Sequence, residues 1–455
     1  MGWVWAAELL AFSMVLLGCT SPPKSLDPRL GGSRGSVVDT TRFAFSHPLP
    51  GLSPKEREDF FVGNNFFMDN WVTAPSSTAA RDGLGPTFNA RSCSACHDRD
   101  GRGRLPEGPG EPFVSALVRV SLVEGGKSRP VPAYGFQIQS HGIVGVPEEA
   151  RPEVVGWEVI EGRFADGSTY ELVRPLVALQ EPQYGPFPPH TAFSVRVAPQ
   201  LIGLGLLEAV PEATLEALAD PEDRDGDGIS GRVHRYEESG RVHVGRFGWK
   251  AASPSVEVQT ARAFLEDMGI TTRLFPEDNC PEAQEACRRA FRHKGPEASD
   301  FVFDAVVFYT RTLAVPAMRN HEDPQVIEGA SYFEAIGCAA CHTPTLRTGP
   351  SDIAAIANQE IHPYTDLLLH EMGPELADGR PEGEAGPAEW RTPPLWGIGL
   401  IETVNRHSRF LHDGRARNLE EAILWHGGEA ESSRENYLRL PRKGREALLR
   451  FLSSL

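Results

Sequence analysis

The spacing of apolar residues along the chain predicts a protein built mainly of helices. In several segments apolar side chains recur every three to four residues, as they do along the buried face of a helix. The first of these segments opens with Ser53-Pro54-Lys55-Glu56, a capping box with proline at the first helical position. The sequence therefore predicts helices over residues 54–71, 256–268, 300–313, 325–336, 419–426 and 441–455.

A second pattern, the alternation of apolar and polar residues, predicts strands between these helices. It runs over residues 113–122, and it recurs over residues 155–173 around Asp166-Gly167 and over residues 232–247 around Ser239-Gly240. Both dipeptides favour tight turns, so the last two segments predict hairpins. We expect a mainly α fold with inserted β-hairpins, an α+β arrangement.

Residues 199–210 and 393–404 form an internal repeat. The two segments share a Pro, a Leu, two Gly, a second Leu, a Glu and a final Val in the same order. A shared order over this many positions predicts two related structural units, the first of them enlarged by the strands.

Each unit contains one Cys-x-x-Cys-His run, at residues 93–97 and at residues 338–342. In this pattern two thiols bond the vinyl groups of haem c and the adjacent imidazole ligates the iron. A zinc site or a redox dithiol is the alternative, but neither run has the further Cys or His at short spacing that zinc requires. The sequence therefore predicts two covalently bound haem c groups, held by Cys93, Cys96, His97, Cys338, Cys341 and His342.

The N-terminal residues suggest export. The first 17 residues are apolar, and they lead into Leu16-Leu17-Gly18-Cys19, as in a bacterial lipoprotein signal. An ordinary signal peptide or a membrane anchor is the alternative, although the stretch is short for a spanning helix. Lipidation of Cys19 would anchor the chain to a membrane, so we expect a periplasmic protein held by its lipid, at the outer membrane in particular.

Two of the seven cysteines, Cys280 and Cys287, have no role in lipid or haem attachment. In an oxidising compartment they should pair. A continuous helix would hold their Cα atoms about 10 Å apart, beyond disulfide reach, so Pro281 should lie in a turn. The pair is either a structural disulfide or a redox-active one.

The acidic composition limits the choice of partners. A formal net charge of −17 argues against nucleic acid and favours a small redox donor protein with a basic face. Part of the acidity lies in Asp223, Asp225 and Asp227, which take positions 1, 3 and 5 of a calcium-loop pattern with Gly228 at position 6. His234 stands at position 12 in place of Glu, so calcium and a solvated turn both remain open.

These observations divide the chain into five parts. They are a lipoprotein signal over residues 1–18, a Ser-, Pro- and Gly-rich tether over 19–50, an N-terminal c-type haem domain with β insertions over 51–250, a helical linker with a disulfide over 251–320, and a C-terminal cytochrome c-like haem domain over 321–455.

From about Phe60 onward, the chain resembles the bacterial di-haem oxidoreductase family of peroxidases and "thiol oxidoreductase" lipoproteins. That family is distantly related to the di-haem cytochrome c peroxidases and to the di-haem enzyme that matures methylamine dehydrogenase. The segments that carry the resemblance lie at residues 85–89, 245–250, 369–373, 390–397 and 410–415.

The resemblance implies further site residues. In the relatives, the residue equivalent to His426 ligates the C-terminal haem, and a distal Glu downstream of the segment equivalent to residues 199–210 serves the N-terminal haem. Here Glu208, Glu212 and Glu216 are in range, with Gln200 as a hydrogen-bond donor. His141 or His190 could instead be the second ligand of the N-terminal haem iron, which would leave no open coordination position.

The resemblance also implies a reaction. Electrons would enter at the C-terminal haem and reach the N-terminal haem, where hydrogen peroxide or another small oxidant is reduced, with Trp249 as a candidate relay. The alternatives are electron transfer alone, and oxidation of a protein or of a thiol substrate, the last through Cys280 and Cys287.

Overall fold

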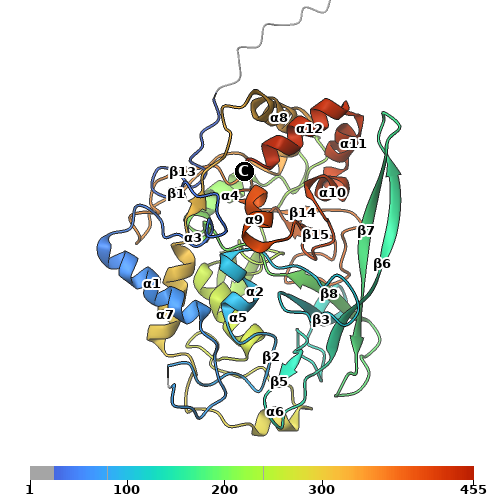
Figure 1. The fold of residues 1–455 in the computed structure, drawn as a ribbon. Coiled ribbons are helices and arrows are strands. Elements are labelled where there is room, and N and C mark those ends of the chain that lie inside the picture. The colour runs from blue at the N-terminus through green and yellow to red at the C-terminus, as the bar shows by residue number, and fades with distance from the viewer. Residues whose placement is uncertain (1–24, 79, 239) are drawn as a thin grey trace, which may run out of the picture.

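The computed structural model describes residues 25–78, 80–238 and 240–455, in which helices and small, mostly antiparallel sheets form an α+β fold (Figure 1). One cluster of buried apolar side chains extends from the first half of the chain into the second. No helix in these described ranges is long and apolar enough to cross a membrane. The predicted signal and its Cys19 lie outside the described residues.

Three helices pack together, with α7 (Asp300–Arg311) in contact with both α1 (Pro54–Met68) and α5 (Val256–Met268). Each begins at a serine whose hydroxyl oxygen accepts a hydrogen bond from a backbone N–H of the first turn, and the predicted capping box at Ser53 is complete. Gly63 lets α1 approach α7 closely, because a Cβ there would collide with the carbonyl oxygen of Ala305.

The strands lie beside these helices. β3 (Ala116–Glu124) is the centre of an antiparallel sheet with β4 (Lys127–Arg129) and β8 (Thr191–Val197). The predicted hairpins are present as β6 (Arg151–Arg163) with β7 (Thr169–Gln180), and as β9 (Arg235–Glu238) with β10 (Arg241–Val244).

The β6–β7 hairpin runs along one side of the molecule and reaches the helices of the second half (Figure 1). At its tip, the Ala165 N–H donates to the carbonyl of Leu438 at 3.0 Å, and Arg445 pairs with Asp166 at 2.9 Å. The hairpin therefore connects distant parts of the chain.

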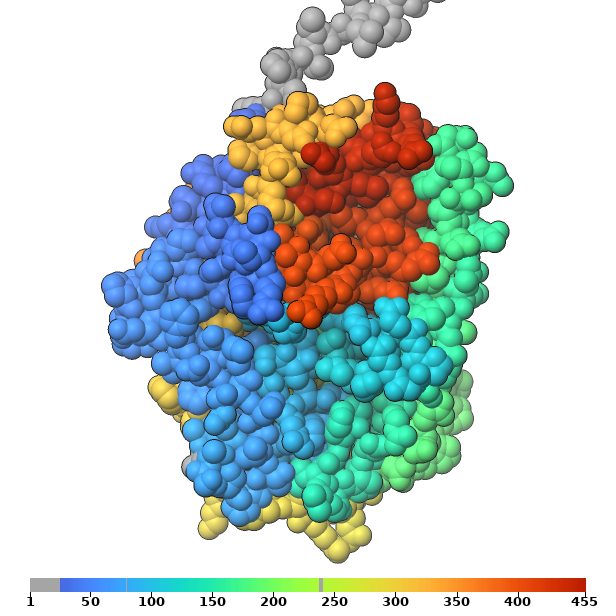
Figure 2. Space-filling model, viewed as in Figure 1, coloured from blue at the N-terminus to red at the C-terminus, as the bar shows by residue number. Residues whose placement is uncertain are grey.

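In the second half, α8 (Pro324–Ala335) packs against α12 (Arg442–Leu452). Nearby lie α10 (Leu419–Leu424), α11 (Glu431–Arg439) and the short sheet of β14 (Leu369–Glu371) and β15 (Glu389–Arg391). In Figure 2 the orange and red segments of this half lie above the cyan segments of the first half.

The remaining elements are short. They are β1 (Ser36–Val37), β2 (Thr87–Phe88), α2 (Cys93–Cys96), β5 (His141–Gly142), α3 (Leu204–Glu208), α4 (Glu212–Leu218), α6 (Glu285–Arg289), β11 (Val315–Pro316), β12 (Leu346–Arg347), β13 (Glu360–Ile361) and α9 (Ile401–Asn405), with 3-10 turns at Asp98–Asp100, Cys338–Ala340, Ile398–Leu400 and Gly428–Ala430.

Two expectations about the organisation of the chain are corrected. The tether expected over residues 19–50 is wrong for its described C-terminal part, because Leu30, Phe45 and Leu49 are fully buried and β1 pairs with β11. Residues 251–320, expected as a linker, contribute α5 and α7 to the core. In both segments isolated apolar side chains pack against residues that lie far away in the sequence.

Candidate functional site

Both Cys-x-x-Cys runs lie in a single tight turn, α2 in the first unit and a 3-10 turn in the second. All four thiols are free of disulfides. Burial raises the pKa of Cys93 and of Cys338 to about 12, so neither is a reactive thiolate. Paired, unreactive thiols facing a cavity suit covalent attachment of a group better than thiol redox chemistry.

The two histidines of these runs are oriented as metal ligands. The His97 Nδ1–H donates to the carbonyl of Pro199 at 2.8 Å, and the His342 Nδ1–H donates to the carbonyl of Tyr364 at 3.0 Å. Burial lowers the pKa of both to about 4, so both rings are neutral. Each Nε2 atom therefore carries no proton and has a free lone pair, which a ligand of iron requires.

His426 faces His342 at a distance that fits one metal between them. Their ring centres lie 6.4 Å apart, and the His426 Nδ1–H donates to the carbonyl of Ala422 at 2.6 Å. With metal–nitrogen bonds of about 2 Å on opposite sides, two imidazole centres are roughly 6 Å apart. The pair therefore has the geometry of the two axial ligands of one haem.

Each Cys-x-x-Cys-His run borders its own cavity. The first cavity, around His97, has a volume of about 240 Å³, and the second, around His342 and His426, about 190 Å³. The residues that line both cavities form a shared wall, and they are Arg102, Gln200, Trp249, Arg391, Pro393 and Pro394. The internal repeat contributes to both, because Pro199 and Pro393 are its first residues.

Two loops of the same backbone conformation precede α5 and α10. Phe247 forms an isolated β-bridge with Ser253, and Phe410 forms the same bridge with Ala416. Both loops have left-handed backbone at their second and fifth residues, with φ of 79° and 52° in the first loop and 67° and 73° in the second. Because the two loops share this conformation, residues that follow at equal spacing occupy equivalent places.

The helices after these loops line the cavities with equivalent residues. Each begins at a side-chain cap, Ser255 or Asn418, that accepts from the third helical N–H at 3.1 and 2.9 Å. The first, fourth, fifth and eighth residues after the cap line the second cavity as Leu419, Ala422, Ile423 and His426, and line the first as Val256, Gln259, Thr260 and Ala263. By this spacing Ala263 corresponds to His426, which lies two residues beyond the end of α10, whereas Ala263 lies within α5.

The structure does not place the expected glutamates in the first cavity. Glu208 accepts from the Val256 N–H at 2.7 Å and pairs with Arg311 at 2.6 Å, while Glu216 is exposed and pairs with Arg235 at 2.7 Å. Gln200 does line both cavities. Neither Glu208 nor Glu216 lines the first cavity, so the structure gives no support to a role for either beside the first haem.

Sequence reasoning missed two polar residues that do face the first cavity. Gln259 precedes Ala263 by four residues and Glu266 follows it by three, so both lie on the cavity face of α5. Glu266 forms an ion pair with Arg119, which also lines the cavity. The signal that could have found them is the equal spacing of residues 247–263 and 410–426. Neither His141 nor His190 lines either cavity.

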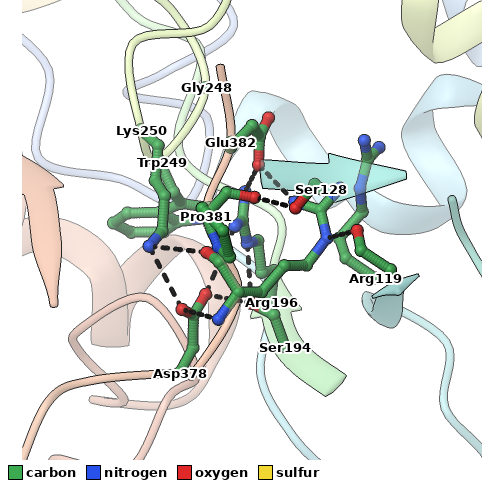
Figure 3. Close-up of polar contacts among 12 residues, drawn as sticks. Arg119, Ser128, Ser194, Arg196, Gly248, Trp249, Lys250, Asp378, Pro381 and Glu382 are labelled. Atoms are coloured by element: carbon green, nitrogen blue, oxygen red, sulfur yellow. Dashed lines mark hydrogen bonds and ion pairs between the residues drawn. The ribbon is translucent and has the colours of Figure 1, made fainter. Parts of the chain in front are cut away.

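A network of buried charges lies between Trp249 and Arg119 (Figure 3). Arg196 pairs with Glu382 at 2.8 Å and with Asp378 at 3.4 Å, and the Lys250 ammonium lies 3.1 Å from Asp378. Although burial raises the pKa of Glu382, Arg196 and other nearby arginines hold it well below its usual range. Burial lowers the pKa of Lys250 to about 8. These pairs fix one wall of the first cavity.

The second cavity has a charged group of its own. His370 donates to Glu429 at 2.6 Å and to Asp366 at 2.8 Å, and its ring also lies 3.6 Å from the sulfur of Cys341. Although burial lowers the pKa of His370, hydrogen bonds to Asp366, Cys341 and Glu429 raise it to about 12. An imidazolium therefore lies next to one attachment cysteine.

The other two expected sites lie apart from the cavities. Carboxylate oxygens of Asp223, Asp225 and Asp227 come within 4.8 Å of one another in an exposed loop, and calcium binding there remains a prediction. Cys280 and Cys287 form a disulfide with their Cα atoms 5.8 Å apart, and the Gln284 N–H donates to the Pro281 carbonyl in a turn.

Two cavities, each with a pair of free cysteines and a neutral histidine, and a second histidine across one of them, define the architecture of a di-haem protein. The chain belongs to the di-haem oxidoreductase family, since the family model described as "Di-haem oxidoreductase, putative peroxidase" matches residues 30–120 and 189–455. The residues between these two ranges include β4 to β7.

Comparison with solved structures gives weak likenesses. Hydrazine synthase of Kuenenia stuttgartiensis, determined under pressurised xenon, is similar over 99% of this chain and 100% of that chain, with 15% identity and a TM-score of 0.38. Similarity at that level carries no argument about fold or activity. No curated protein matches the sequence.

Proposed function

We propose that the protein is a c-type di-haem oxidoreductase that reduces hydrogen peroxide with electrons from a small donor protein. Cys93 and Cys96 would attach the N-terminal haem, with His97 as its axial ligand. The second haem would be attached to the cysteines of residues 338–342 and held between His342 and His426. Family membership supports the two haems, and the orientation of the histidines supports their ligation.

The observation that carries peroxide reduction is Ala263. A methyl group stands in the first cavity where His426 stands in the second, and His97 is the only histidine among the described residues that line the first cavity. Met268 also lines it, but it follows Ala263 by five residues and so projects about 140° away around the helix. A haem held by His97 would therefore have no second histidine ligand from α5, and a small oxidant could bind to it, which electron transfer alone would not need.

Gln259 and Glu266 supply the proton chemistry that peroxide cleavage requires. The haem iron, when present, binds the peroxide and delivers electrons to it. The Glu266 carboxylate would accept a proton from hydrogen peroxide and return it to the departing oxygen, and the Gln259 amide would donate a hydrogen bond to that oxygen. Arg119 holds Glu266 toward the cavity. Two electrons from the donor and two protons convert each peroxide into two waters.

The shared wall supports electron transfer between the two haems. Trp249 lines both cavities, and its Nε1–H donates to the carbonyl of Val197 at 2.9 Å, which fixes the ring. We propose that electrons enter at the C-terminal haem and cross this wall to the N-terminal haem. The charge of −17 supports a donor with a basic face.

Thiol oxidation receives less support from the structure. Cys287 is fully buried and Cys280 is half-buried, so a thiol substrate has no approach to the inner sulfur of their disulfide. Export and lipid anchoring through Cys19, to the outer membrane in particular, are part of the proposal on the strength of the sequence pattern.

Electron paramagnetic resonance of the resting ferric protein, and of the protein after addition of one electron, tests the proposal. We expect a high-spin signal from the N-terminal haem in at least one state, and oxidation of a reduced small cytochrome when peroxide is added. Two low-spin signals in both states, with no binding of cyanide or peroxide, would instead mean an electron carrier.

A further inference from the structure

Two buried arginines lie in the wall between the cavities. Arg102 and Arg391 are each 7% exposed, and each lines both cavities. Arg102 donates from Nε to the carbonyl of Arg409 at 2.9 Å and from Nη2 to the carbonyl of Leu411. Arg391 donates from Nε and Nη1 to the carbonyls of Gly248 and Thr392, both at 3.0 Å. These bonds fix both guanidinium planes at the wall.

Neither arginine has a carboxylate partner among the described residues. Three other arginines near the cavities do: Arg119 pairs with Glu266, and Arg196 and Arg380 pair with Glu382. Burial lowers the pKa of Arg102 and of Arg391 to about 10. Asp413 near Arg102 and Asp366 near Arg391 act in the opposite direction, but neither forms an ion pair with its arginine and burial outweighs both. A buried cation without an ion-pair partner is costly, and a ligand carboxylate in the adjoining cavity would reduce that cost.

We propose that Arg102 and Arg391 bind haem propionates, so that a propionate of each haem is held at the shared wall. A guanidinium presents a planar fork of N–H groups that matches a carboxylate, and one nitrogen of each remains without a hydrogen bond to the described chain. The proposal requires that the chain carry two haems, which its family shows, and it is independent of peroxide reduction.

The proposed contacts bear on electron transfer across the wall. The Arg102 guanidinium carbon lies 5.1 Å from the centre of the Trp249 ring. A bare cation at this distance opposes removal of an electron from the indole, and a paired propionate would offset that effect. The same cations favour ferrous iron over ferric iron, because the ferric haem carries one more positive charge.

Substitution of each arginine by methionine in the loaded protein tests the proposal. Arg102→Met and Arg391→Met should each lower the midpoint potential of at least one haem and shift the propionate bending modes in the resonance Raman spectrum. Arg319→Met is the matched control, because Arg319 also donates to backbone carbonyls and its pKa is also lowered to about 10 by burial, yet it lines neither cavity. The control should change neither quantity.

Lysine variants keep the test decisive if a methionine variant does not fold. Arg102→Lys and Arg391→Lys retain the charge but lose the fork, so the Raman modes should shift while the potentials stay close to those of the unmodified protein. Potentials and modes that match the unmodified protein in every folded arginine variant would overturn the proposal. Both measurements use resting protein without peroxide, so absence of peroxide reduction would not affect the result.

Discussion

Replacing Ala263 by histidine should give the N-terminal haem iron a second histidine ligand and so block the position at which peroxide would bind. The new imidazole would occupy the place that His426 occupies in the second cavity, eight residues after the cap of an equivalent helix. The ring centres of His342 and His426 lie 6.4 Å apart, a separation that would allow both to ligate one iron, and we expect the same of His97 and a histidine at residue 263. If coordination is favoured by about 2.7 kcal/mol over the open state, about 1% of the iron stays open, so peroxide turnover should fall about 100-fold.

The measurement is electron paramagnetic resonance followed by peroxide turnover with a reduced cytochrome. Ala263→His should convert the high-spin signal to a low-spin one that resembles the signal of the C-terminal haem. Ala263→Val is the control, because it adds bulk at the same place without a ligand atom and should leave the iron high-spin. An Ala263→His protein that folds, carries both haems and stays high-spin would refute the equivalence of α5 and α10.

Three further predictions concern residues outside this position. Glu266→Gln should lower kcat/KM for peroxide by about 10²- to 10⁴-fold, the usual loss for a general acid–base group, whereas Glu208→Gln, which lies outside the cavity, should change it only a few-fold; equal effects in steady-state assays would argue against Glu266 as the base. Burial raises the pKa of Glu149 from 4.5 to about 8, so the folded chain holds a proton that the unfolded chain releases, and the free energy of unfolding should fall by up to about 5 kcal/mol as pH rises across that interval. Denaturant titrations at several pH values check this, and Glu149→Gln should flatten the dependence. Replacing Cys280 and Cys287 by serine should cost about 2 kcal/mol of stability and leave peroxide turnover unchanged below the unfolding temperature; lost turnover in the folded variant would favour thiol chemistry.

Local patterns in the sequence were enough to predict most of the secondary structure. The predicted helix over residues 256–268 has the bounds of α5, and the hairpins around Asp166-Gly167 and Ser239-Gly240 are present. Elsewhere helix ends differ by a few residues, as at α1, which ends at Met68 before the chain turns toward Trp71. Caps, turns and periodicity act between neighbours in the sequence, and this is why they can be recognised without a structure.

Gln259 and Glu266, which we propose for the proton chemistry, could not be found in the same way. The β9–β10 hairpin separates the first repeat segment from the loop at residue 247, whereas the second unit has no hairpin between the corresponding segments. Counting forward from residue 210 therefore led to Glu216, which the structure places on the surface. The alignment of residues 247–263 with residues 410–426 becomes evident only when the backbone conformations of the two loops are compared.

The sequence by itself determined the elements whose cause is local: the two Cys-x-x-Cys-His runs at residues 93–97 and 338–342, the pairing partner of Cys280, and the main helices and hairpins. Only the tertiary structure decided which side chains meet across the chain. It placed His426 opposite His342, put Ala263 in the corresponding place of the other cavity, and left Arg102 and Arg391 unpaired in the wall between them. Burial and facing geometry depend on segments far apart in sequence, so no local pattern can encode them.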